Sequence, residues 1–198
     1  MLAYNIPGVR NLVLTREQIV GIYNGSLINW NDPIFAAYNP RLNLPNATIV
    51  PVARFDSSGS TEIFTRALSS FSAAWATQYG SFSSRNGWNT STVTLFVQRT
   101  TGVADAINRQ PYRIGYVTPA SAVEVSLPFA SVVNKCGQVT NGDKRSVQEA
   151  MDARSSSMSS RLTSNLVDSE SEHAYPIAAY SYFIVRMKQE GNCSVATG

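Results

Sequence analysis

One short stretch, "ARFDSSGST", combines residues that could bind an anion. An apolar run ends just before Arg54, and a helical pattern begins after four small residues. The first N–H groups of a helix are unpaired and carry about half a positive charge. Gly59 lets a ligand come close to the backbone, and Arg54 supplies a charged fork. Hydroxyl donors come from Ser58, Ser60 and Thr61. The stretch therefore predicts an anion site at a helix N-terminus.

Asp56 is the unexpected member of this stretch, because a carboxylate repels an anion. It helps only if the anion brings a proton to donate, or if it orients Arg54. Phosphate near neutral pH carries such a proton and sulfate does not, so an acceptor-only group favours phosphate. A purely structural role stays open as the alternative: Ser and Asp at a helix start are ordinary caps, and Arg54 and Asp56 suit a local ion pair. No G-K-[ST] follows, which excludes a Walker A loop.

A strand and a helix must position these residues. "ATIVPVAR" is typical of a strand, and "STEIFTRALSSFSAAW" is typical of a helix. Elsewhere apolar runs alternate with helical patterns, which predicts an α/β fold. Thr15 and Gln18 form a capping box at the start of one such helix. The other expected strands cover 2–6, 92–97, 113–119 and 175–187 (one long or two short), and the other helices 15–26, 101–110 and 144–156.

Composition limits the class of protein. The chain has 198 residues, 43% of them apolar and 15% charged, so it can fill a core and is not a disordered chain. A net charge of +3 without a Lys/Arg run argues against nucleic acid as a partner. The longest near-apolar stretch, 175–185, is too short for a membrane span, and "MLAYNIPGVR" lacks the pattern of a signal peptide.

Other chemistry has little support in the residues. His173 is the single histidine and no G-x-S-x-G elbow occurs, so we expect no hydrolase and no enzyme. A zinc cluster would lack ligands, so no metal and no cofactor are expected. Trp88 lies in a polar loop, where a core or lid position is favoured over sugar stacking. Cys136 and Cys193 stand in Gly/Asn-rich loops, which favours one disulfide in a secreted domain over two free thiols in a cytosolic protein.

Beyond the short stretch, most of the chain resembles one family. The residues from Arg54 to Thr61 resemble the R-x-D-x-S-G-T-[ST] segment of the periplasmic phosphate-binding proteins, the substrate receptors of bacterial phosphate ABC importers. "LAYNIPGV", "TGVADAINRQPYRIGYV" and "AYPIAAYSYFIV" resemble other segments of that family in the same order. The resemblance implies α/β lobes that close on one phosphate, and a mixed, mostly parallel sheet with helices on both faces. It implies that residues 1–198 form a single type II periplasmic-binding-protein-like lobe.

The resemblance also implies a role for each residue of the stretch. Arg54 would pair with phosphate oxygens, and Asp56 would accept the phosphate proton and brace Arg54. Ser58 and Ser60 would donate hydroxyls, and the N–H of Gly59 would donate from the helix start. Ser60 stands where the family usually has Thr, which keeps the hydroxyl.

Two departures from the family pattern affect partners. Tyr112 and Arg113 replace small residues before Gly115, which changes the surface there. The family's first lobe would precede Met1 and finish after the last strand, so we expect one lobe, an open half-site, of a longer protein. The implied partners are phosphate, the first lobe or a partner protein, and an ABC permease, in an extracellular, periplasmic or cell-surface location. A repurposed extracellular interaction or adhesion module with the same fold is the alternative.

Overall fold

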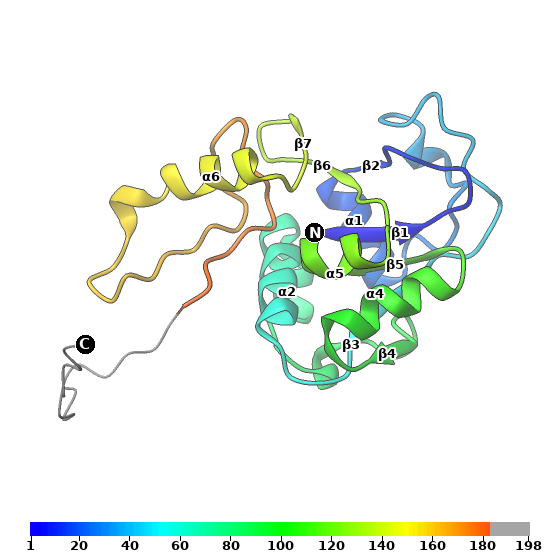
Figure 1. Ribbon diagram of the computed structural model, residues 1–198, viewed down its shortest axis with the longest axis horizontal. Coiled ribbons are helices and arrows are strands. Elements are labelled where there is room, and N and C mark those ends of the chain that lie inside the picture. The colour runs from blue at the N-terminus through cyan, green and yellow to red at the C-terminus, as the bar shows by residue number, and fades with distance from the viewer. Residues whose placement is uncertain (183–198) are drawn as a thin grey trace, which may run out of the picture.

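The computed structural model describes residues 1–182, which form a sheet domain and an arm that extends from one side of it (Figure 1). The arm is defined as residues 141–182. The strands are β1 (Leu2–Asn5), β2 (Val13–Leu14), β3 (Val50–Arg54), β4 (Leu95–Val97), β5 (Arg113–Tyr116), β6 (Ser131–Val133) and β7 (Val139–Thr140). The helices are α1 (Arg16–Asn24), α2 (Gly59–Phe71), α3 (Ala73–Gln78), α4 (Arg99–Arg109), α5 (Pro119–Glu124) and α6 (Lys144–Asp152), with 3-10 turns at Pro33–Phe35, Arg85–Gly87 and Ser155–Ser157.

The main sheet has four strands in the order β1-β5-β3-β4. Strand β3 is parallel to both of its neighbours, and β1 is antiparallel to β5. A smaller sheet, β2-β6-β7, lies beside it. The expected mixed, mostly parallel sheet is therefore confirmed.

Helices cover both faces of the main sheet. Successive side chains of a strand point to opposite faces. On β1, Leu2 and Tyr4 join a large core with α1 and α2, whereas Ala3 joins a second core with α4 and α5. On β3, Ala53 faces the first core and Val52 the second. Figure 1 shows α4 lying across the sheet on the side that also carries α5.

Local signals determined several of these elements. The capping box at the start of α1 is present, and Ile19, Ile22 and Tyr23 are buried together as the pattern predicts. The helix expected over 60–75 is split, because Ser72 is extended and its side chain accepts a hydrogen bond from Trp75 N. One element ends and another begins at this serine, as is common for a residue that caps helices.

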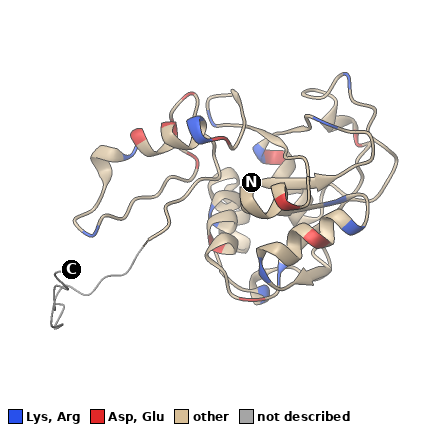
Figure 2. Cartoon of the chain, viewed as in Figure 1, with Lys and Arg blue, Asp and Glu red and all other residues tan. Residues whose placement is uncertain are grey.

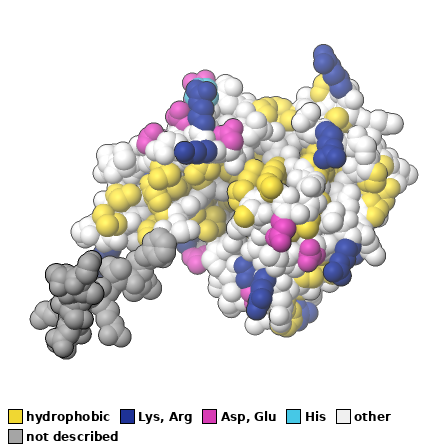
Figure 3. All heavy atoms as spheres, in the orientation of Figure 1, with side chains coloured by type: hydrophobic (Ala, Val, Ile, Leu, Met, Phe, Trp, Pro, Cys, Tyr) yellow, Lys and Arg dark blue, Asp and Glu magenta, His cyan; other side chains and the backbone are white. Residues whose placement is uncertain are grey.

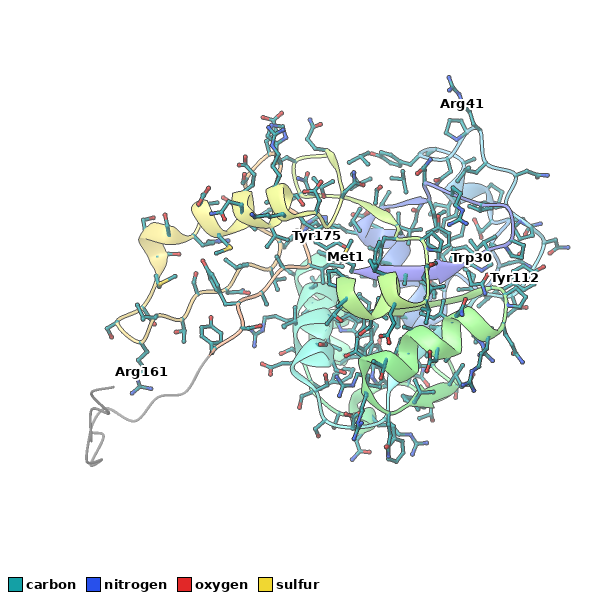
Figure 4. All side chains as sticks on the ribbon, in the orientation of Figure 1. Met1, Trp30, Arg41, Tyr112, Arg161 and Tyr175 are labelled. Carbon is teal, nitrogen blue, oxygen red and sulfur yellow. The ribbon has the colours of Figure 1, made fainter. Side chains whose placement is uncertain are left out.

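The residues that depart from the family pattern before Gly115 are used internally. Tyr112 has φ 68°, and its carbonyl accepts hydrogen bonds from Trp30 Nε1 at 3.2 Å and from Val50 N at 3.0 Å (Figure 4). Arg113 Nη1 donates to the carbonyl of Ala106 at 2.7 Å, near the C-terminal end of α4. Both residues thus fix the contact between α4, β5 and the Trp30 region.

The arm is attached to the sheet domain through apolar and polar contacts, since Val167 and Tyr175 are buried in the main core and Asp168 forms hydrogen bonds with the sheet domain. Arg16 pairs with the buried carboxylate of Asp168 at 2.8 Å, and Ser70 Oγ donates to the same carboxylate at 3.2 Å. The arm has a small apolar cluster of its own, made of Ala150, Leu166, Ala174 and Ala178. Figure 3 shows apolar side chains gathered along the arm beside α6.

The strand predicted over 175–187 is wrong for its described part. Residues 175–182 contain no strand, and the remainder lies outside the described residues. Pro176 accepts one backbone hydrogen bond, from Asp168 N at 2.9 Å, while Ala178 and Tyr180 pack against the α6 side of the arm. A strand needs a paired neighbour, and here no sheet edge lies alongside this run.

Candidate anion site

The residues of the predicted anion site lie where β3 ends and α2 begins. Ser58 is the N-cap of α2, and its Oγ accepts a hydrogen bond from Ser60 N at 3.1 Å. Ser58 N donates to the carbonyl of Ser83 at 2.8 Å, which fixes the turn against the loop before Trp88. Gly59 is exposed, and a Cβ added there would meet no atom within 4 Å. The start of α2 is therefore capped, held in place and open to a ligand. We call these residues, Arg54 to Ser60, the anion cradle.

Arg54 and Asp56 form an ion pair inside this cradle. Arg54 Nε donates to Asp56 Oδ1 at 3.1 Å, and Nη2 donates to Oδ2. The backbone N–H of Arg99, at the start of α4, also donates to Asp56 Oδ1, at 3.0 Å. The hydrogen bonds from Arg54 hold the pKa of the Asp56 carboxyl well below its usual range. Asp56 is therefore ionised at neutral pH and fixes the plane of the guanidinium.

Both partners keep unused capacity for a ligand. A guanidinium has five N–H donors, and Arg54 uses three of them, two on Asp56 and one on Thr100 Oγ1 at 3.3 Å, which leaves 5 − 3 = 2. A carboxylate has about four acceptor positions. Asp56 fills three with Arg54 Nε, Arg54 Nη2 and Arg99 N, which leaves about one. The pair can thus donate to an anion and accept one proton from it.

Four residues at the cradle were not predicted as its supports. Tyr116 OH accepts a hydrogen bond from Arg54 N at 3.0 Å and shares another with Thr61 Oγ1 at 2.7 Å. The prediction of Thr61 as a ligand donor is wrong: the residue is fully buried, and its hydroxyl supports the cradle by bonding Tyr116. Thr100 and Arg99 arrive from α4. The "RIGYV" pattern placed Tyr116 on a strand, but no local signal indicated that this strand lies beside β3.

The aromatic core behind the cradle keeps Tyr116 in place. Its ring stacks on Phe64 with centroids 4.7 Å apart and lies 6.3 Å from Trp88. Trp88 is 5% exposed, so this residue belongs to the core and cannot stack on a sugar at the surface. Burial raises the pKa of Tyr116, which therefore stays protonated near neutral pH.

The other sequence candidates lie on the arm or close to it. His173 is exposed and forms no hydrogen bond with any residue that the structure describes. Cys136 is exposed, and its thiol donates to the carbonyl of Glu170 at 3.3 Å. Cys193 lies outside the described residues, so the Cys136–Cys193 disulfide stays a prediction. Within residues 1–182 no cluster of His, Cys, Asp and Glu side chains could hold a metal ion.

Charged side chains are scattered over both the sheet domain and the arm in the view of Figure 2. The described residues contain no helix with the length and apolar character of a membrane span. As a whole, the arrangement places donors from Arg54, from the start of α2 and from serine hydroxyls around one fixed carboxylate.

Comparison with known proteins identifies the family of this chain. The sequence profile of the PBP superfamily domain matches residues 1–197. The chain belongs to the PBP superfamily. Within this superfamily it is 30% identical over 203 aligned residues to the phosphate-binding protein PstS of Methanocaldococcus jannaschii, covering 96% of this chain and 52% of that protein. It is 31% identical to the phosphate-binding protein PstS of Haemophilus influenzae, covering 91% of this chain and 54% of that protein.

A solved structure confirms the fold of this PBP superfamily chain. A human phosphate-binding apolipoprotein matches it with a TM-score of 0.55 at 19% identity, covering 89% of this chain and 54% of that one. The chain thus spans about half the length of the curated relatives it matches.

Proposed function

We propose that this chain binds inorganic phosphate without catalysing a reaction. The observation that carries the proposal is the Arg54–Asp56 pair beside an open, capped helix start, in a chain homologous to PstS phosphate-binding proteins. A protein-interaction or adhesion module would have no need for an Arg54–Asp56 pair beside an open helix start, so we favour phosphate binding over that alternative.

Each residue of the cradle has a proposed role. The two spare N–H groups of Arg54 donate to phosphate oxygens, and the N–H of Gly59 donates from the start of α2. The hydroxyls of Ser58 and Ser60 add donors. Ser58 is 8% exposed and its Oγ already accepts from Ser60 N, so its own O–H is free to donate toward the ligand.

Asp56 has two roles in this proposal. It orients Arg54 through two hydrogen bonds, and its remaining acceptor position accepts a hydrogen bond from the protonated oxygen of phosphate. Sulfate carries no such proton near neutral pH and would face an ionised, unpaired acceptor. The bracing contributes to the affinity for both anions, whereas the proton contact favours phosphate alone.

The cradle is proposed to be half of a site. Residues 1–198 would form one lobe, and a first lobe would supply the remaining contacts, each charge-assisted hydrogen bond being worth about 1.5–3 kcal/mol. The single lobe should therefore bind phosphate weakly, toward the millimolar range. In this proposal the complete protein lies outside the cytoplasm, needs no cofactor and delivers phosphate to an ABC permease.

Titration of the 198-residue chain with phosphate and with sulfate tests the proposal. We expect phosphate to shift the NMR signals of the Gly59 and Ser60 amides more strongly than sulfate does at equal concentration. Asp56→Asn should weaken the binding of both anions and bring their affinities closer together. Unchanged discrimination in Asp56→Asn would limit Asp56 to bracing, and unshifted amides with phosphate in the millimolar range would contradict the proposed function.

A further inference from the structure

A cavity lies between α2 and the arm. Its volume is about 560 Å³, and it is lined by Arg66, Arg154, Ser157, Thr163, Ser164, Asn165 and Tyr182. Arg66 follows Gly59 by seven residues, which is about two helical turns or roughly 10 Å along α2. We call this space the arm cavity. A smaller hollow, whose lining includes Gly59 and also Arg66, lies between it and the anion cradle, so the two sites are neighbours with different anchoring residues.

Among the described residues, the arm cavity is lined by one buried donor without a partner and by an amide with unused donors. Arg154 Nε is buried and has no hydrogen-bond partner among the described residues, and its guanidinium forms no ion pair there. Asn165 Oδ1 accepts from Val167 N at 3.2 Å, which leaves its NH2 group free to donate. Asn165 is exposed, so its amide can also be hydrated. Buried donors without acceptors are rare in folded proteins, so for Arg154 Nε an acceptor from a ligand is the physical expectation.

The remaining lining groups set the polarity of the cavity. The backbone N–H of Ser164 donates to Tyr182 OH at 3.2 Å, which leaves the Ser164 hydroxyl uncommitted. Arg66 pairs with Glu62, so Arg154 is the stronger candidate to anchor an anion. Among the residues that line this cavity there is no carboxylate.

We propose that the arm cavity binds a sulfated monosaccharide. The free groups are donors, which suit a fully ionised oxyanion, and no acceptor-only group demands a proton from it, in contrast to Asp56 in the cradle. A volume of about 560 Å³ exceeds what a bare oxyanion fills and lies in the range of small-molecule pockets. Hydroxyl and amide side chains suit a polyhydroxylated body, and the half-exposed ring of Tyr182, 6.1 Å from Tyr180, gives it an apolar edge.

Titration of the 198-residue chain with glucose 6-sulfate, glucose and inorganic sulfate tests this site. We expect glucose 6-sulfate to bind more tightly than either of the other two probes. Arg154→Gln should weaken its binding by about tenfold or more, because a charge-assisted bond is lost. Arg154→Lys keeps the charge without the fork and should fall in between.

Arg161 provides the matched control. It lies on the same arm, is exposed, and does not line the cavity (Figure 4). Arg161→Gln should leave the binding of glucose 6-sulfate unchanged, and Asn165→Ala should weaken it. Thermal melts and a phosphate titration of each variant show whether the sheet domain is intact.

Three results would overturn the proposal. They are no binding of glucose 6-sulfate, equal weakening by Arg161→Gln and Arg154→Gln, and inorganic sulfate binding as tightly as the sugar sulfate. The last result would mean that the sugar body makes no contact. Since the arm cavity does not share Arg54 or Asp56 with the cradle, failure of phosphate binding would leave this test unaffected.

Discussion

The hydroxyl of Tyr116 joins the two ends of the anion cradle. It accepts the backbone N–H of Arg54 at the end of β3, and it bonds Thr61 in the first turn of α2 at 2.7 Å. The segment between these residues carries Asp56 and Ser58. A small shift at either end would therefore move the donors relative to one another, and charge-assisted bonds depend strongly on such geometry.

We predict that Tyr116→Phe weakens phosphate binding severalfold while the fold is kept. The loss of one neutral hydrogen bond at this position is worth about 1 kcal/mol. Tyr4→Phe is the matched control, because Tyr4 OH is also buried and accepts a backbone N–H, from Leu12 at 3.2 Å, away from the cradle. Both variants should lower the melting temperature by a similar amount, and only Tyr116→Phe should lower phosphate affinity.

Two substitutions of Thr61, to Ser and to Val, distinguish the effect of its hydrogen bond to Tyr116 from the effect of side-chain packing. Thr61→Ser keeps the hydroxyl that bonds Tyr116 and should retain affinity, whereas Thr61→Val removes it and should match Tyr116→Phe. Equal affinity in Thr61→Val and the wild type would show that the Tyr116 link does not position the cradle.

At the scale of elements, two glycines have opposite surroundings. Gly115 on β5 faces α4, where an added Cβ would lie 2.8 Å from Val103 and 3.1 Å from Ile107. The helix packs so closely on the strand that it leaves no room for a side chain. At the start of α2, Gly59 has open space in front of it, which a ligand can use.

We predict that Gly115→Ala destabilises the protein and that Gly59→Ala does not. Overpacking at Gly115 should cost about 1–3 kcal/mol, seen as a fall in melting temperature of several degrees. Gly59→Ala should melt at or slightly above the wild-type temperature but bind phosphate less tightly, because the methyl group enters the ligand's space. Unchanged phosphate affinity in Gly59→Ala would argue that the ligand does not approach this backbone.

At the scale of the 198-residue chain, stability against pH depends in part on a buried amine. The α-amino group of Met1 donates to the carbonyl of Val117 at 2.9 Å, next to the β1–β5 pairing (Figure 4). Burial lowers the pKa of this amine from 8.0 to about 5. The folded state therefore favours the neutral amine, while the unfolded chain takes up a proton below about pH 8.

We predict that the free energy of unfolding of the 198-residue chain falls as the pH is lowered from about 8 to about 5. Between these values the unfolded state binds more protons than the folded state, so the loss grows until the folded amine also protonates. The fall of the pKa from 8.0 to about 5 limits the effect to a few kcal/mol, since a tenfold change in proton affinity corresponds to about 1.4 kcal/mol. Denaturant unfolding at several pH values measures it, and acetylation of the Met1 amine should remove this part of the pH dependence. The same slope in the acetylated chain would assign it to other groups.

The sequence by itself determined the elements whose signals are local. The strand before Arg54, the capping box of α1, and the Ser58–Gly59 start of α2 follow from neighbours within a few residues. The type and order of the cradle residues were also readable, because the chemistry of an anion site at a helix start needs only that short stretch. The division of the 60–75 helix at Ser72 was missed, since a capping serine resembles a serine within a helix.

Only the tertiary structure decided what surrounds that stretch. Tyr116 is 62 positions from its partner Arg54 in the sequence, and Arg99 is 43 positions from its partner Asp56. They meet because β5 and β4 flank β3 in the sheet. The tertiary structure also decided that residues 175–182 do not form a strand. The run has strand-like composition, but no sheet edge lies beside it. Local patterns specify the elements and their chemistry, whereas the order of strands in the sheet specifies which distant side chains orient Arg54 and Asp56.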